Sequence, residues 1–171
     1  MRKLRYQVVC SLDGFIAGPS GEYDWIPDDD SIDLVAFFTQ FDTFLLGRRT
    51  FEGMSAEGPN PLAGQRVYVV STTLDPAKHP DVTVISTGLV DVVQALKAEE
   101  GKDIWLFGGG ALFRSLMDAG LVDTVELAIA PVLLGGGIPV IGPGQRSPQL
   151  RLVSTRTFPS GIVWCDYEVQ R

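Results

Sequence analysis

The feature that most limits the possible folds is a run of four large apolar residues, Ile104 to Phe107, that leads directly into three glycines, Gly108 to Gly110. A helical pattern follows from Ala111 to Ala119, and Gly120 stands where a helix C-terminal cap is expected. A buried strand that turns sharply into a helix is the repeating unit of parallel α/β sheets. The run therefore predicts a chain built around a parallel sheet.

The same alternation recurs along the first two thirds of the chain, whereas the last third reads as strands without helices between them. Asp28 to Asp30 and Ser31 supply the N-cap and acidic first turn of the first helix. The predicted strands are Arg5–Ser11, Thr43–Leu46, Arg66–Ser71, Val82–Ile85, Asp103–Phe107, Val122–Ala130, Leu150–Phe158 and Ile162–Val169. The predicted helices are Ser31–Gln40, the turn and helix from Gly47 to Met54, Val90–Glu99 and Ala111–Ala119. We predict one α/β domain over residues 1–171, with a mixed, mostly parallel sheet, helices on both faces and a C-terminal antiparallel hairpin.

Composition excludes several classes of function. The 171 residues carry a net charge of −7, which argues against non-specific binding to nucleic acid or to anionic membranes. No apolar run approaches the roughly 20 residues that span a bilayer, and no signal peptide is convincing, so we expect a cytoplasmic protein. Cys10 and Cys165 lie in strand patterns and are expected to be buried, reduced thiols. No residue set has metal-ligand spacing.

Three predicted strand ends carry residues suited to a phosphate-containing ligand. The glycine run lets a ligand approach the backbone and the free N–H groups of a helix start, although a tight turn would also account for it. Arg48, Arg49 and Thr50 follow Gly47 at another helix start, where two cations oppose the helix dipole unless an anion lies between them. Ser71, Thr72 and Thr73 end a third strand. Open α/β sheets bind ligands outside the carboxyl ends of their strands.

Five segments together resemble one superfamily. They are Val9–Ala17, Tyr23–Ile26, Gly47–Thr50, Gly108–Gly110 and Ala130–Pro139. In order and over nearly the whole chain, they resemble the dihydrofolate-reductase-like fold, in the branch of the C-terminal reductase domain of the riboflavin-biosynthesis deaminase-reductase.

The resemblance implies an NADPH-dependent reductase that forms a homodimer. Ala17 would lie against the nicotinamide, Gly47, Arg48, Arg49 and Thr50 would hold the phosphates, and Ser71 and Thr72 would approach the adenosine 2′-phosphate. The central part of the cofactor would lie along Gly108, Gly109, Gly110, Ala111 and Leu112. These positions agree with the ligand class that the strand ends themselves indicate.

Two departures from the family pattern leave the substrate open. Riboflavin-pathway reductases carry a Glu just before the paired glycines, where this chain has Phe107 or Gly108. Dihydrofolate reductases place an acidic residue five positions after a Trp, which here is Asp30 after Trp25. Counting from the Gly-Arg pair gives Ser31 instead, and Asp28, Asp29 and Asp33 compete for the role. Helix capping alone would also account for this acidic run.

We predict reduction of a small heterocyclic compound, either a ribosylaminopyrimidine or a dihydrofolate or pterin. Asp30 would hold or relay the proton beside an apolar wall of Trp25, Phe37 and Phe38. Asp13 is a second catalytic candidate, although it could equally be a turn residue before Gly14. The alternative is a non-catalytic NADP(H)-binding sensor or regulatory protein, and a weaker one is a fold that serves only dimerisation.

Overall fold

The computed structural model describes residues 1–56 and 62–170. The strands are β1 (Leu4–Ser11), β2 (Phe15–Ala17), β3 (Phe41–Gly47), β4 (Arg66–Val70), β5 (Thr83–Ile85), β6 (Asp103–Gly108), β7 (Thr124–Ala130), β8 (Ile138–Pro139), β9 (Leu150–Thr157) and β10 (Val163–Val169). The helices are α1 (Leu34–Phe38), α2 (Arg48–Ala56), α3 (Leu89–Ala98) and α4 (Gly110–Asp118), with a 3-10 turn η1 (Pro76–Lys78).

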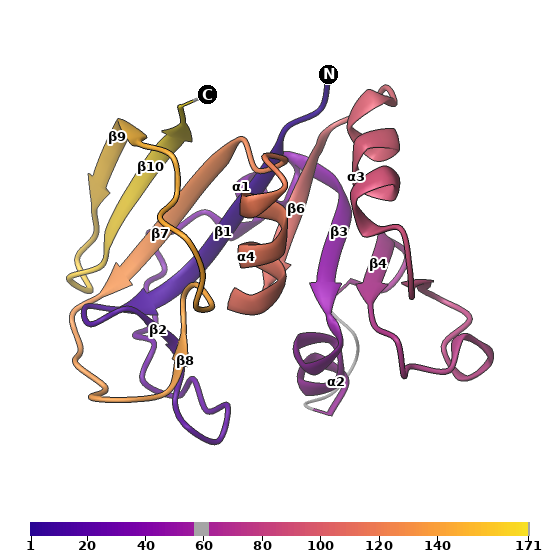
Figure 1. Ribbon diagram of the computed structural model, residues 1–171. Coiled ribbons are helices and arrows are strands. Elements are labelled where there is room, and N and C mark those ends of the chain that lie inside the picture. Colours follow the sequence, from indigo (N-terminus) through magenta and orange to yellow (C-terminus); the bar gives the residue numbers. More distant parts are fainter. Residues whose placement is uncertain (57–61, 171) are drawn as a thin grey trace.

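Eight strands form one sheet in the order β5-β4-β3-β6-β1-β7-β10-β9. The first six in this order pair in parallel, and β10 is antiparallel to both β7 and β9. This confirms the predicted mixed, mostly parallel sheet with its C-terminal hairpin. Because the parallel strands point the same way, their carboxyl ends meet at the lower edge in Figure 1, opposite both chain termini.

A second sheet was not predicted. β2 and β8 pair antiparallel, with Phe15 opposite Pro139 and Ala17 opposite Ile138. These strands have three and two residues, too short for an alternating pattern to be visible in the sequence. The small sheet lies beyond the carboxyl end of β1 and brings residues 131–142 back across it (Figure 1).

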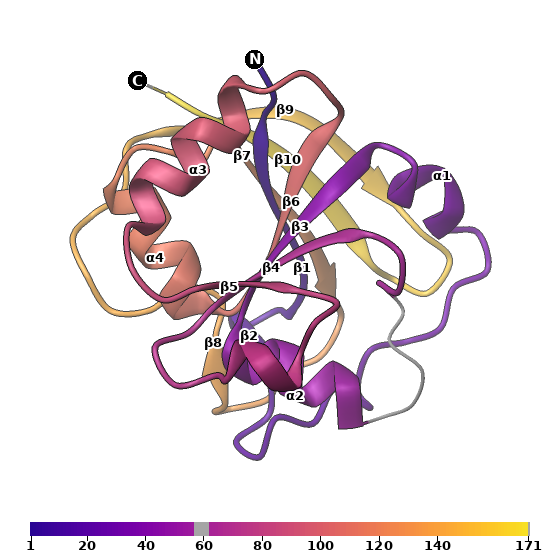
Figure 2. The ribbon, with the colours of Figure 1, turned by 90° about the vertical axis from the view of Figure 1, so that its right-hand side faces the viewer.

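Helices cover both faces of the large sheet, as predicted. Figure 2 shows α3 and α4 on one side and α1 on the other. On the α3 and α4 side, Tyr6 of β1 stacks on Phe113 of α4 with ring centroids 3.7 Å apart. On the α1 side, the buried Trp105 of β6 lies at the centre of an aromatic cluster with Phe37, Phe41 and Phe44. Burying such side chains supplies most of the free energy that holds helices against a sheet.

The first helix is shorter than predicted. It covers Leu34–Phe38, not Ser31–Gln40, and its N-cap is Asp33, whose carboxylate accepts a hydrogen bond from the Ala36 amide at 2.8 Å. The earlier acidic residue Asp29 instead accepts hydrogen bonds from Ser31 and from the Ser160 amide of the β9–β10 hairpin. The helix ends early because Phe41, only 3% exposed, already belongs to β3 and the core.

Candidate functional site

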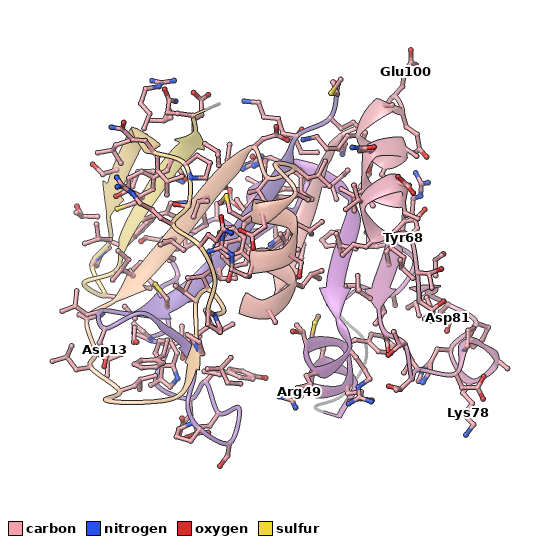
Figure 3. The ribbon with its side chains drawn as sticks, viewed as in Figure 1. Asp13, Arg49, Tyr68, Lys78, Asp81 and Glu100 are labelled. Carbon is pink, nitrogen blue, oxygen red and sulfur yellow. The ribbon has the colours of Figure 1, made fainter. Side chains whose placement is uncertain are left out.

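The predicted cofactor residues gather at the carboxyl edge of the sheet. β3 ends at Gly47, β4 is followed by Ser71, and β6 ends at Gly108. Figure 3 shows Asp13 and Arg49 at this lower edge, whereas Glu100 lies at the opposite edge. The topology thus brings together three turns that are far apart in the sequence, as expected from their strand ends.

The glycine turn after β6 forms the middle of this edge. Gly108 has a φ of +118°, and its peptide bond to Gly109 is cis. A Cβ atom on Gly109 would lie 3.8 Å from Ile16 Cδ1 and 3.9 Å from Thr50 Oγ1. A Cβ atom on Gly47 would lie 3.6 Å from the Gly108 carbonyl oxygen. Gly47 therefore lies beside the Gly108–Gly109 peptide, and Gly109 faces Ile16 and Thr50, so that a ligand at this edge can approach the backbone of the turn.

Gly110 has a different role from the two glycines before it. A Cβ atom there would lie 2.5 Å from the carbonyl oxygen of Pro139, and the Gly110 carbonyl accepts a hydrogen bond from Gly142 at 3.0 Å. Val140 is held in the same segment by the Tyr6 hydroxyl, which donates to its carbonyl oxygen at 2.6 Å. Gly110 is thus covered by residues 139–142, while Ala111 remains exposed and Leu112 is buried. The predicted role of Gly110 and Leu112 in lining the cofactor is not supported by these contacts.

The two arginines after Gly47 differ in their contacts. Arg48 donates to Thr73 Oγ1 at 2.6 Å, which links the start of α2 to the loop after β4, and its Nε lies 3.7 Å from Glu52. Arg49 is exposed and has no ion pair or side-chain hydrogen bond with the described residues. One guanidinium therefore braces the two turns, and the other is free to meet an anion.

Ser71 and Thr72 also divide into two roles. The buried Ser71 hydroxyl accepts hydrogen bonds from the backbone amides of Thr73 at 3.1 Å and Leu74 at 2.9 Å. It thereby shapes the turn that holds Thr73 beside Arg48. Thr72 is exposed at the tip of this turn. Of the two, Thr72 presents the hydroxyl that an approaching phosphate can reach.

Ala17 and Asp13 belong to the small sheet. Ala17 is 9% exposed, and a Cβ atom on Gly137 would lie 2.2 Å from its carbonyl oxygen, so the residue before β8 packs closely against it. Asp13 accepts hydrogen bonds from the Ser11 hydroxyl at 2.6 Å, the Leu134 amide at 3.1 Å and the Gly135 amide at 2.7 Å. The Ser11 hydroxyl, followed by these amides, lowers the pKa of Asp13 to about 2. An ionised carboxylate that holds a loop fits a turn role better than that of a proton donor.

The other acidic candidate lies on the loop before α1. Asp30 is exposed and makes no side-chain hydrogen bond or ion pair with the described residues. Trp25 is half-buried, and its indole N–H donates to the Glu22 carbonyl at 3.1 Å. Asp30 is thus sterically free to act, but no neighbour holds it in one orientation.

Phe37 and Phe38 lie on the aromatic core instead of an open wall. Phe37 is buried against Phe41, Trp105 and Trp164, and Phe38 packs against Trp105 with ring centroids 4.9 Å apart. Phe37 also lines a groove of about 500 Å³ whose other walls include Arg5, Asp103 and Thr124, at the amino ends of their strands. The structure thus places Phe37 away from the carboxyl edge, and its predicted contact with substrate is not supported.

One buried polar residue, Gln7, was not predicted from the sequence as a site residue. Gln7 of β1 is 6% exposed, on the same face as Arg5 and Val9 because strand side chains alternate. A signal was available, since a polar residue in a central parallel strand, which is buried on both faces, is unusual.

Cys10 and Cys165 are buried and free, and burial raises the pKa of Cys10 to about 11. The described residues contain no group of three or more His, Cys, Asp or Glu side chains able to hold a metal ion. Among the described helices, none has the length and hydropathy of a membrane-spanning segment.

Comparison with known proteins gives one family and one fold. The family described as RibD C-terminal domain matches residues 2–164. The uncharacterized protein YyaP of Bacillus subtilis is 34% identical over 97% of this chain and 94% of its own. A putative riboflavin biosynthesis protein from Shewanella sp. PV-4 superposes with a TM-score of 0.85 at 24% identity, over 99% of both chains. Dihydrofolate reductase from Enterococcus faecalis, complexed with NADP(H), superposes with a TM-score of 0.71 at 20% identity, over 99% of this chain and 97% of its own. The fold is dihydrofolate-reductase-like, as predicted.

Proposed function

This chain belongs to the RibD C-terminal domain family, and we propose that it is an NADPH-dependent reductase of a small heterocyclic compound. The observation that carries the proposal is the close approach of Gly47, Thr50 and Gly109 at the carboxyl edge, where the exposed Arg49, unpaired within the described residues, also lies. Three glycine or hydroxyl positions from two different turns suit a ligand that approaches backbone closely and carries negative charge.

The cofactor would lie along this edge. Gly47, Thr50 and Gly109 fit it because the place that a Cβ of Gly109 would take, 3.8 Å from Ile16 Cδ1 and 3.9 Å from Thr50 Oγ1, is left open to the cofactor. Arg49 would neutralise the phosphates, and Arg48 with Thr72 would read the 2′-phosphate, since the Arg48–Thr73 hydrogen bond fixes the guanidinium beside that turn. Ala17 would bound the nicotinamide end. Ser71 would contribute indirectly, because its hydroxyl shapes the turn that holds Thr73 beside Arg48.

NADPH supplies a hydride when it is bound, and the chain supplies orientation and a proton. β2 and β8, held by Asp13, would exclude water from the Ala17 side. Asp30 remains the proposed proton carrier, acting from the loop beside Trp25. Because its carboxylate has no partner in the described part of the chain, a bound substrate would have to order it.

The proposed substrate class is taken from the family resemblance. A ribosylaminopyrimidine of the 5-amino-6-(5-phosphoribosylamino)uracil type and a dihydrofolate or pterin are the two candidates. Phe107 and Gly108 stand where riboflavin-pathway reductases carry a Glu, which weighs against the first. Asp30 is exposed and no described residue holds its carboxylate in one orientation, which weighs against a dihydrofolate or pterin.

The testing experiment titrates NADPH and NADH into the purified protein and follows tryptophan fluorescence. We expect NADPH to bind about tenfold more tightly than NADH, and Arg48→Met to remove most of that difference, because a charge-assisted hydrogen bond contributes about 1.5–3 kcal/mol. Arg151→Met, at an exposed ion pair on the edge strand β9, is the matched control and should bind as the wild type. Equal affinity for both cofactors would contradict the NADPH preference, and no binding at millimolar concentration would contradict the reductase.

A non-catalytic NADP(H)-binding sensor is the second candidate. It is favoured by one observation: Asp13 is engaged with a loop, and Asp30 is exposed without a partner in the described part of the chain, so neither carboxylate is held for proton transfer. Turnover with dihydrofolate or a ribosylaminopyrimidine that is lost in Asp30→Asn, while NADPH still binds, would support the enzyme. Cofactor binding without turnover of either substrate class would support the sensor.

We further propose that the protein is a cytoplasmic homodimer. The edge strand β9 exposes Leu152 and Val153, each more than half exposed, and Val163 of β10 is 37% exposed. Exposed apolar side chains on an edge strand and its neighbour favour association with a second copy. The two free cysteines fit a reducing compartment. Light scattering coupled to size-exclusion chromatography would give twice the 18.5 kDa chain mass for a dimer.

A further inference from the structure

The buried polar side chains of the described residues have hydrogen-bond partners with one exception, Gln7. The partnered ones are Arg2, Ser11, Thr43, Ser71, Lys97, Arg114 and Glu126. The Gln7 side-chain amide has no hydrogen bond to any of the described residues, although its backbone carbonyl accepts one from the Trp105 indole at 3.0 Å. Buried amides in native proteins almost always have a partner, so this exception points to an interaction that the chain alone does not supply.

The Gln7 amide is not sealed inside the core. No side-chain nitrogen or oxygen of the described residues is both closed to solvent and unpaired. Both polar atoms of the amide are therefore accessible to solvent, even though the residue is only 6% exposed. An accessible amide that is unpaired within the described residues can meet a group that enters from outside.

The Gln7 amide lies close to the glycine turn. Gly108 is at the level of Val8, because a Cβ atom on Gly108 would lie 4.0 Å from Val8 Cγ1. Gln7 is the residue before Val8 in β1, and its side chain lies on the opposite face, the α1 face, with Arg5 and Val9. Gln7 therefore lies within one residue of the level of the glycine turn.

We infer that Gln7 is a specificity-determining residue that hydrogen-bonds an adjacent carbonyl and N–H, a lactam edge, on the heterocyclic substrate. The inference rests on the proposed reductase function and names the feature by which its site would select a substrate. A primary amide offers one donor and one acceptor side by side, and a lactam offers the complementary pair. A site that holds an unpaired buried polar group discriminates strongly against ligands that leave it unpaired.

Two alternative roles for the Gln7 amide lead to different results. If the amide met the carboxamide of the nicotinamide instead, Gln7 variants would change the affinity for NADPH itself. If the amide were merely tolerated by the fold, Gln7 variants would alter thermal stability and no affinity. Replacing Gln7 by an apolar residue removes an unpaired amide, so the variants are expected to fold with unchanged or higher Tm.

The experiment titrates two probes into the protein saturated with NADP⁺. Lumazine carries lactam edges, and 1,3-dimethyllumazine is the same ring system with both N–H groups blocked. They are titrated into the wild type, Gln7→Leu, Gln7→Met and the control Gln94→Leu, which removes an exposed glutamine of α3 on the other face of the sheet. NADPH affinity and Tm are measured for each protein.

We expect the wild type and Gln94→Leu to bind lumazine at least tenfold more tightly than the dimethyl compound. Gln7→Leu and Gln7→Met should lose most of that preference while binding NADPH normally. The inference is overturned if the wild type does not prefer lumazine or fails to bind it, or if the preference survives in both Gln7 variants. It is also overturned if these variants weaken NADPH binding. Since NADPH is titrated into the wild type separately, a failure of the cofactor to bind marks failure of the reductase proposal itself.

Discussion

The amino and carboxyl edges of the parallel sheet differ in how their charged side chains are paired. At the amino edge the charged side chains are paired within the chain: Arg5 makes a double hydrogen bond to Glu126 at 2.7 and 2.8 Å, and the buried Arg2 contacts Asp42 and Thr43. At the carboxyl edge lie the glycine turn after β6 and Arg49, which follows β3 and has no partner among the described residues.

This difference distinguishes charged groups that stabilise the fold from charged groups that are available to a ligand. A charged group that the chain satisfies by itself needs no ligand, and the groove beside Arg5 is lined by carboxylates that already have partners, such as Asp166, which accepts from Trp164 at 2.8 Å. Groups that the described part of the chain leaves unpaired, such as Arg49 and the Gln7 amide, are those with an interaction still to make.

The largest effect is expected at the amino edge. Glu126→Leu leaves the Arg5 guanidinium, whose side chain is 15% exposed, without its main partner. We expect the free energy of unfolding to fall by about 3 kcal/mol or more, because removing one member of a buried pair strands the other charge. Urea denaturation measures this, and NADPH affinity should not change.

The control for that variant is Glu168→Leu, which breaks an exposed pair with Arg151. Exposed pairs contribute about 0–1 kcal/mol, so this variant should unfold almost as the wild type does. If both variants lost the same stability, the amino-edge network would not be the structural element described.

Two neighbouring glycines of the turn after β6, Gly109 and Gly110, are expected to respond differently to an added methyl group. Gly110→Ala should lower stability by about 1–3 kcal/mol, because its Cβ would lie 2.5 Å from the Pro139 carbonyl oxygen and force the covering segment away. Gly109→Ala has ordinary contact distances to Ile16 and Thr50, so it should fold normally but lose NADPH binding. Thermal melts and NADPH titrations of both variants separate the two effects.

A control position lies in a second glycine run, Gly135 to Gly137. Gly136 has no atom within 4 Å of a Cβ position and no positive φ, so Gly136→Ala should change neither stability nor affinity. Normal NADPH binding by Gly109→Ala would show that the space beside Thr50 is not the cofactor site.

The smallest effect is local and depends on pH. The pKa of Asp13 is lowered in the fold to about 2, below the ordinary value of about 3.9 for an Asp, so its contribution is fully present above that ordinary value. It is lost as the pH falls through about 2. Hydrogen exchange at the Leu134 and Gly135 amides should therefore quicken, relative to the rest of the chain, between about pH 4 and pH 2.

Asp13→Asn provides the comparison for that measurement. It removes the charge and should give faster exchange at these two amides at every pH, without the acid step. An unchanged acid step in Asp13→Asn would assign the effect to another group.

The sheet could be predicted from the sequence, because its strands are apolar runs that end in glycine or hydroxyl residues, as from Ile104 to Gly108. The predicted strand bounds differ from the observed ones by one or two residues, and Gly120, with a φ of +68°, caps α4 as expected. The turns at Gly47 and Ser71 were placed correctly for the same reason: the direction of a parallel strand decides at which edge its end lies.

The rest depends on contacts between distant segments, which no local pattern encodes. Gly110 reads as part of a ligand-binding turn, but its neighbour Pro139 comes from a two-residue strand. Asp13 reads as a turn or catalytic residue until its partners, Leu134 and Gly135, are known. Phe37 has the right spacing for a pocket wall, and only its packing on Trp105 and Trp164 shows that it is core.

The most direct test of the contrast between the two edges is amide hydrogen–deuterium exchange with and without saturating NADPH. We expect protection at residues 47–51, 71–74 and 108–111, at the carboxyl ends of β3, β4 and β6. We expect no change at residues 99–104 and 122–126, at the amino edge. Protection at the amino edge, or no protection at the three turns, would contradict the assignment of the carboxyl edge as the cofactor site.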